Sequence, residues 1–148
     1  MLLLAIGAAL AAYFTTTGGG TRRPLAWQDL SAQVPPAEWA QPTISVARDP
    51  TKLEKVFARA TYGRHPRPPR IDFANREAVL VAAGPRSSTG YVLQVGRVTQ
   101  QGNSIDIVVR ERTPSLHDRV TARLTYPILL ITLPKSGKHV HVRYAGRS

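Results

Sequence analysis

The chain of 148 residues contains no cysteine. This absence excludes a disulfide framework, a thiol nucleophile and a cysteine-ligated zinc or iron–sulfur centre. Acidic residues are also scarce, because nine Asp and Glu stand against twenty Lys and Arg, and the formal net charge is +11. Such a balance favours anionic partners, such as acidic proteins, phospholipid head groups or nucleic acid, without selecting one of them.

A hydrophobic run long enough to span a membrane is missing as well. The uncharged apolar stretch Met1–Phe14 would form a helix of about 21 Å, whereas a bilayer core is about 30 Å thick. We interpret this stretch as the apolar part of an export signal, with Ala9–Ala11 as a candidate cleavage site. A short membrane anchor and a buried N-terminal helix are the alternatives. The expected location is therefore outside the cell or tethered at the cell envelope.

Three parts are predicted along the chain. Residues 1–21 comprise the signal or anchor and a flexible Thr/Gly linker. Residues 22–42 form an extended arm with several prolines, which packs on the domain through Trp27 and Trp39. Residues 43–148 form a β domain.

One amphipathic helix is predicted after a short strand at Thr43–Ala47. Asp49 suits the N-cap of a helix and Pro50 suits its first position. An apolar stripe follows at helical spacing, formed by Leu53, Val56, Phe57 and Ala60. We expect Gly63 to end the helix.

From residue 78 onward the sequence has the pattern of β-structure. Two continuous apolar runs, Ala78–Ala83 and Ile128–Leu133, predict strands covered on both faces. Alternating patterns predict four more strands, at Tyr91–Thr99, Ser104–Arg112, Arg119–Leu124 and His139–Tyr144. The predicted fold is mainly β (α+β), an antiparallel sheet or sandwich of about six strands with one packed helix.

No motif assembles a catalytic or metal site. Ser87 and Ser88 lie in one loop and His117 in another, and a G-x-S-x-G elbow is lacking. His139 and His141 share the outward side of a predicted strand, but a third metal ligand of matching pattern is missing. The carboxylates are scattered singly, mostly among arginines. With the exception of Asp72, we assign them to surface ion pairs: Glu77, Asp106, Glu111 and Asp118. We therefore expect no enzyme activity, no cofactor and no metal.

Short motifs follow one another along the β region in a characteristic order. Ile71-Asp72-Phe73 precedes the strand Ala78–Gly84, Arg86–Tyr91 reads RSSTGY, a hairpin ends in Arg110–Pro114, and Leu124–Ile128 reads LTYPI. This ordered set resembles the C-terminal domain of the PrcB family, bacterial envelope proteins named after a subunit of a surface protease complex. The sequence departs from the family pattern in having a single glycine before the tyrosine of RSSTGY and no aromatic residue at the end of LTYPI.

The resemblance implies a non-catalytic, exported or membrane-tethered domain that binds another protein. Its most specific form would be an accessory subunit of an envelope protease complex. The contact patch is expected at Gly84, Arg86, Ser88, Thr89, Gly90, Tyr91, Thr125, Tyr126 and Pro127, because loops at the end of a sandwich are held rigidly for recognition. Asp72 and Phe73 are expected to be structural, with the carboxylate of Asp72 holding a turn through backbone N–H groups.

Two other classes of function stay open. The S-T-G-Y end of the loop resembles the N-P-T-T-G-Y loop of chagasin-type cysteine-protease inhibitors, which are also small β-sandwiches, although the other two inhibitory loops have no counterpart. The second class is binding of a polyanion, either nucleic acid or a cell-wall polymer, by a basic face. The outward positions predicted for that face are Arg110, Arg112, Arg119, Arg123 and Arg143. Nucleic acid is disfavoured because the aromatic residues lack the spacing of an RNA-binding sheet.

Overall fold

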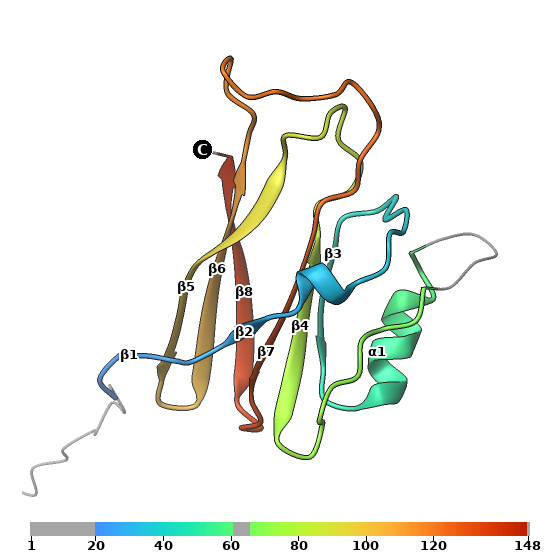
Figure 1. Cartoon of the computed structure of the whole chain (residues 1–148). Helices are drawn as coiled ribbons and strands as arrows, with labels where there is room; N and C mark the ends of the chain where they lie inside the picture. The colour runs from blue at the N-terminus through green and yellow to red at the C-terminus, as the bar shows by residue number, and fades with distance from the viewer. Residues whose placement is uncertain (1–19, 61–65, 148) are drawn as a thin grey trace, which may run out of the picture.

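The computed structural model describes residues 20–60 and 66–147. These residues form two four-stranded sheets and one short α-helix (Figure 1). Sheet A has the order β1 (Arg23–Pro24), β5 (Val92–Gln101), β6 (Ser104–Arg112) and β8 (His139–Arg147). Sheet B has the order β2 (Gln28–Asp29), β7 (Ile128–Pro134), β4 (Arg76–Ala82) and β3 (Thr43–Ala47). The predicted mainly β fold is confirmed.

The strand pairs are antiparallel except for one. β8 runs parallel to β6, with Ile105 opposite Val140 and Ile107 opposite Val142. This parallel pair differs from the predicted antiparallel arrangement. It arises because the chain leaves sheet A after β6, passes down sheet B as β7 and only then returns to sheet A.

Sheet B lies between two apolar layers. Its inner face packs on sheet A, and we call this layer the inter-sheet core, with Val79, Val81, Leu129, Ile131, Ile105, Ile107 and Val109 among its buried members. Its outer face packs on the helix and the arm as the helix-side core, which includes Leu80, Leu130, Leu53, Phe57 and Trp39. The two continuous apolar runs are therefore covered on both faces, as their sequence predicts.

Helix α1 (Pro50–Phe57) begins as predicted. The Oδ1 of Asp49 accepts a hydrogen bond from the backbone N–H of Lys52 at 2.8 Å. The helix ends well before Gly63, which lies outside the described residues. Its Phe57 ring meets Trp39 edge to face, with the ring centroids 5.6 Å apart.

The arm is tied to the domain by backbone pairing as well as by rings. It supplies β1 to sheet A, β2 to sheet B and a 3-10 turn, η1 (Ser31–Gln33). Trp39 is buried, whereas Trp27 is 41% exposed, so the expectation that both rings pack the arm on the domain holds for Trp39 only. Among the described residues no helix is long and apolar enough to cross a membrane. The predicted signal or anchor and most of its linker lie outside the described residues.

The strand predicted at Arg119–Leu124 is wrong. The stretch between β6 and β7, residues 113–127, crosses from sheet A to sheet B over one end of the sandwich, where neighbouring strands do not flank it (Figure 1). We call this stretch the crossover loop. Its backbone forms one isolated bridge, between Thr125 and Arg86. Val120 and Leu124, predicted to face inward, are 42% and 62% exposed.

Candidate functional site

The loop Gly84–Tyr91 and the crossover loop are joined by hydrogen bonds. Arg86 and Thr125 exchange two backbone bonds, of 2.8 and 2.9 Å. Thr89 donates its N–H to the Thr121 carbonyl at 3.1 Å, and the Thr89 hydroxyl oxygen accepts from the Thr121 N–H at 3.0 Å. The Thr125 hydroxyl donates to the Ser88 carbonyl at 2.7 Å. The structure therefore brings together the two segments that the sequence predicts to form one surface. The polar groups of Thr89 and Thr125 form the hydrogen bonds that hold these segments together.

Gly90 sits where the two loops touch. A Cβ atom at this position would collide with the side chain of Pro114 and lie 2.6 Å from Cγ1 of Val120. Both of these residues belong to the crossover loop. The glycine before Tyr91 is thus required by close approach of the crossover loop.

Arg86 connects the first loop to the interior. Its Nε and Nη2 lie 2.8 and 2.7 Å from Oε2 of Glu111 on β6. Its Nη1 donates to the carbonyls of Ala83 and Pro85 at 3.0 and 2.9 Å. The hydrogen bond with Glu111 is the largest cause that raises the pKa of Arg86, so the guanidinium keeps its charge. The guanidinium carbon also lies 6.0 Å from the centre of the Tyr91 ring, within reach of a cation–π interaction.

Glu111 corrects the sequence-based assignment. Its side chain and that of Glu77 are fully buried, although both were expected in surface ion pairs. Glu77 binds Arg48 at 2.9 Å, in an ion pair that links β4 to the end of β3. Both glutamates continue the inward alternation of their strands, Glu111 after Ile107 and Val109. Strict alternation could therefore have identified them from the sequence.

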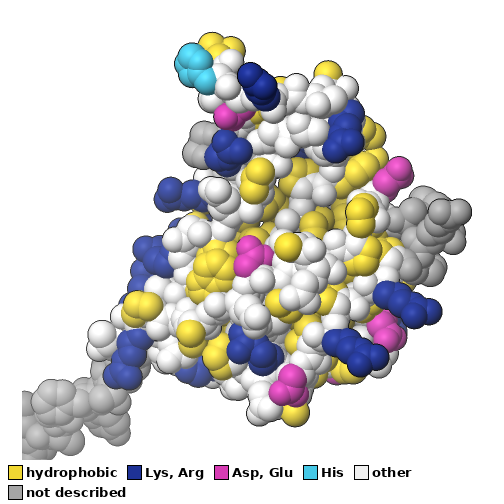
Figure 2. Space-filling view, viewed as in Figure 1, with side chains coloured by type: hydrophobic (Ala, Val, Ile, Leu, Met, Phe, Trp, Pro, Cys, Tyr) yellow, Lys and Arg dark blue, Asp and Glu magenta, His cyan; other side chains and the backbone are white. Residues whose placement is uncertain are grey.

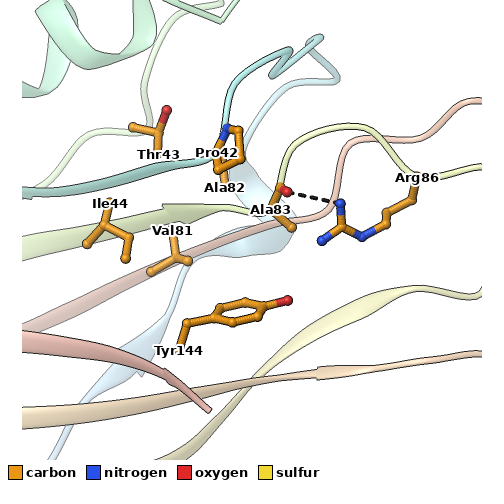
Figure 3. A pocket seen from close by; sticks show the side chains of 8 residues that line it. All are labelled: Pro42, Thr43, Ile44, Val81, Ala82, Ala83, Arg86 and Tyr144. Atoms are coloured by element: carbon orange, nitrogen blue, oxygen red, sulfur yellow. Dashed lines mark hydrogen bonds between the residues drawn. The ribbon is translucent and has the colours of Figure 1, made fainter. Parts of the chain in front are cut away.

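A slot opens beside Arg86, between the edge strands β3 and β8 (Figure 3). Its volume is about 470 Å³, and its lining comprises Pro42, Thr43, Ile44, Val81, Ala82, Ala83, Arg86 and Tyr144. The Tyr144 ring crosses the slot and its hydroxyl points toward Arg86 (Figure 3). Desolvation, followed by the hydrogen bond with Glu111, raises the pKa of Tyr144. The slot can hold an apolar group beside the phenol of Tyr144 and the guanidinium of Arg86.

The crossover loop exposes an unusual amount of apolar surface. The described residues include seven large hydrophobic side chains that are well exposed, and four of them lie at this end of the sandwich: Val92, Leu116, Val120 and Leu124. Leu116 is 103% exposed and Leu124 62% exposed. Three exposed arginines lie on the crossover loop or next to it in the sequence, namely Arg112, Arg119 and Arg123. Figure 2 shows hydrophobic and basic side chains side by side at the top of the molecule. We call Val92, Leu116, Val120 and Leu124 the apolar tip.

The remaining predicted patch residues lie apart from the tip. Tyr126 packs against the helix-side core, and the Pro127 carbonyl accepts from the Ala83 N–H at 3.0 Å. Gly84 is buried, with a φ of +79° that favours glycine. These residues therefore fix the conformation of the loops through packing, a hydrogen bond and a backbone turn.

Asp72 holds a turn, as expected. Its Oδ1 accepts from the Ala74 N–H at 3.1 Å and its Oδ2 from the Asn75 side chain at 2.7 Å. These bonds, with that to Asn75 the largest cause, lower the pKa of Asp72. Phe73 packs against the helix-side core and its carbonyl accepts from Lys135 Nζ at 2.7 Å.

The residues considered for chemistry are dispersed. His117 and Asp118 lie on the crossover loop, where Asp118 accepts from the Ser115 N–H at 2.9 Å and from Arg112 at 3.2 Å. His139 and His141 are exposed on the outward side of β8. Within the described ranges no group of three His, Asp or Glu side chains could hold a metal ion.

The fold and this site define a β-sandwich domain with a rigid two-loop surface at one end. Residues 78–134 match the family model described as PrcB C-terminal, which confirms the resemblance seen in the sequence. The match runs from β4 to β7 and includes both loops of the site. Neither a curated protein nor a solved structure shows a significant match to the chain.

Proposed function

We propose that this protein is a non-catalytic binding domain of the bacterial cell envelope, exported or tethered, which contacts another protein through the apolar tip. The observation that carries this proposal is the exposure of Leu116 and Leu124 on a loop fixed by hydrogen bonds to its neighbour. Large apolar side chains that stay exposed among charged residues favour a protein interaction site.

The tip has the composition of a contact centre. Burying one leucine side chain contributes about 1.5–3 kcal/mol, so two leucines and two valines supply enough apolar area to anchor a partner. Arg112, Arg119 and Arg123 are exposed on the same stretch of chain, which favours a partner that carries acidic side chains as well as an apolar centre. The hydrogen bonds that hold the loops lower the ordering cost of binding.

The match to the PrcB C-terminal family supports an accessory role beside an envelope protease as the specific form of this function. The apolar, uncharged sequence of Met1–Phe14 supports export or tethering. We expect the full-length protein to fractionate with membranes or to be processed outside the cell. Full-length protein in the soluble cytosol would contradict this location.

The test compares two pairs of substitutions in the full chain. Leu116→Ser with Leu124→Ser removes the centre of the tip, whereas Trp27→Ser with Ile44→Ser removes exposed apolar side chains from the arm and from β3. The proteins that the wild type retains from native membranes are identified by mass. We expect the tip variant to lose these proteins by at least about tenfold while the control retains them.

Three outcomes would redirect the proposal. Equal loss in both variants, or equal retention, would exclude the tip. Loss only on Arg119→Ala with Arg123→Ala, together with a steep salt dependence, would favour binding of a polyanion. Inhibition of a papain-type protease by the wild type, abolished by Tyr91→Ala, would favour the inhibitor alternative.

A further inference from the structure

The outer face of sheet A is a cationic surface separate from the tip. Its outward side chains include Arg97 on β5, Arg110 on β6 and Arg143 on β8, and Arg22 of the arm joins them. Arg22, Arg97, Arg143 and His141 line a hollow of about 250 Å³ over Val108. In Figure 2 basic side chains follow the left flank of the molecule, which is the side of sheet A.

A β-bulge directs one of these arginines outward. The pairing of β5 with β6 shifts between Val95, opposite Val109, and Arg97, opposite Val108. Without the extra residue, Arg97 would continue the inward alternation of Leu93 and Val95. With it, Arg97 is exposed and Val98 takes the inward position, 5% exposed. Bulges commonly redirect a side chain at a functional site.

The arginines of this face have little opposing charge. The ion pairs among the described residues join Arg48 to Glu77, Arg86 to Glu111 and Arg112 to Asp118, and none includes an arginine of the hollow. Asp106 is the acidic side chain in the lining. A cluster of cations from three separate elements therefore repels itself until an anion enters. One guanidinium group donates two parallel hydrogen bonds to two oxygens of the same phosphate. A phosphate therefore fits this lining better than an anion with a single acceptor atom.

We infer that this hollow, with Arg110 beside it, binds the phosphate groups of anionic phospholipids at a membrane surface. Two observations favour a membrane over nucleic acid. Apart from the imidazole of His141, the lining contains no aromatic side chain on which a base could stack. Gly20, the first described residue, lies against Gly102 in the β5–β6 turn, where its Cβ would be 3.1 Å from the Gly102 nitrogen.

The position of Gly20 places the start of the domain at the end of sheet A (Figure 1). Five residues, Thr15–Gly19, separate it from the apolar Met1–Phe14 sequence, and they can span at most about 17 Å. If that sequence enters a membrane, the basic face is held within reach of the head groups. This part of the inference rests on the tethering in the proposed function.

The test uses the full chain and two kinds of vesicle, phosphatidylcholine alone and phosphatidylcholine with phosphatidylglycerol. Binding to the neutral vesicles measures the contribution of the apolar segment, and the difference between the two vesicles measures the basic face. We expect a preference for the anionic vesicles that weakens as salt rises from about 50 to 200 mM.

Two variants of equal charge change locate the site. Arg97→Gln with Arg143→Gln should reduce the preference for anionic vesicles by roughly 25-fold, since each arginine at a charged membrane contributes about fivefold. Arg59→Gln with Arg70→Gln, on exposed residues near the helix, should leave it within about twofold. Far-ultraviolet circular dichroism confirms that both variants fold.

Three outcomes would overturn the inference, and a fourth bears on the tethering alone. Equal binding to the two vesicles would exclude a phosphate-selective face, and equal loss in both variants would reduce the effect to net charge. Tighter binding to a duplex DNA or to free inorganic phosphate than to the anionic vesicles, lost in the Arg97/Arg143 variant, would assign the hollow to that ligand. If the protein binds the anionic vesicles but not the neutral ones, tethering by the apolar segment is contradicted and the inference about the basic face is retained.

Discussion

Nη2 of Arg86 lies 2.7 Å from Oε2 of Glu111, and this ion pair joins the loop after β4 of sheet B to β6 of sheet A. The glutamate side chain is fully buried and that of the arginine is 15% exposed. The loop Gly84–Tyr91 is therefore fixed twice, through Thr125 to the crossover loop and through Glu111 to the opposite sheet.

Loss of Arg86 should destabilise the protein strongly. Arg86→Met leaves the buried carboxylate of Glu111 without its cation, and we expect the free energy of unfolding to fall by about 3–5 kcal/mol. Urea denaturation followed by tryptophan fluorescence measures the change. The matched control is Arg112→Met, because the ion pair of Arg112 with Asp118 is exposed and should cost at most about 1 kcal/mol. A loss no larger than that of the control would show that the buried pair contributes little.

The double variant Arg86→Met with Glu111→Leu should recover much of that loss. It removes the buried charge together with its partner, and apolar replacements of such pairs are often close to neutral. We expect it to be more stable than Arg86→Met alone, as measured by the same urea titration. A double variant less stable than either single one would point to a separate role for the Glu111 carboxylate, such as holding Tyr144.

Stability should depend on alkaline pH through Tyr144. Desolvation and the bond with Glu111 raise its pKa above the value of about 10 that an unfolded tyrosine has. The neutral phenol thus contributes stability that is complete below pH of about 10 and is lost as pH rises through the higher folded value. Unfolding free energies between pH 8 and 12 should fall more steeply for the wild type than for Tyr144→Phe. Identical slopes would be inconsistent with a titrating Tyr144.

Gly90→Ala should separate the two loops. The added methyl group meets Pro114 and Val120, and overpacking of this kind costs about 1–3 kcal/mol. The control is Gly96→Ala, where a Cβ atom would have its nearest neighbour at 3.5 Å, on Arg110. Hydrogen exchange at the Thr121 and Thr125 amides reports the loop contact directly. We expect faster exchange in the Gly90 variant only.

The N-cap of α1 offers a local test of the helix-side layer. Asp49→Ala removes the bond to the Lys52 N–H, which should lower the free energy of unfolding by about 0.5–2 kcal/mol. Asp49→Asn, which keeps a cap acceptor, should retain most of it. Thermal denaturation of both variants gives the comparison, and equal losses would assign the effect to charge instead of capping.

Patterns that report local burial predicted most of this fold. The apolar runs of β4 and β7, the capped start of α1 and the inward Val140 and Val142 of β8 are all where the sequence placed them. Pairing partners are set by contacts between distant segments, so the parallel β6–β8 pair left no local signal. The prediction of a strand in the crossover loop was wrong for a related reason. The alternation at Val120 and Leu124 is typical of a strand, but this segment has no neighbouring strand with which to pair.

The candidate site was predicted in outline. The sequence identified the loop around Arg86 and its partner Thr125 through the family resemblance, and the structure joins them. It missed Leu116, whose exposure depends on how the crossover loop rises over the end of the sandwich. It also misassigned Glu111, because a charged residue on an inward position was attributed to the surface and the buried guanidinium that balances it comes from 25 residues earlier.

The passage of the chain from β6 through β7 to β8 has a kinetic consequence. Because β7 of sheet B lies between β6 and β8 along the chain, the strands of the two sheets alternate in the sequence and sheet A pairs segments that are far apart. Such non-local pairing requires long loops to close before contacts repay them, and folding on the millisecond-to-second scale is expected. The two sheets should consequently form and dissolve as a single cooperative unit.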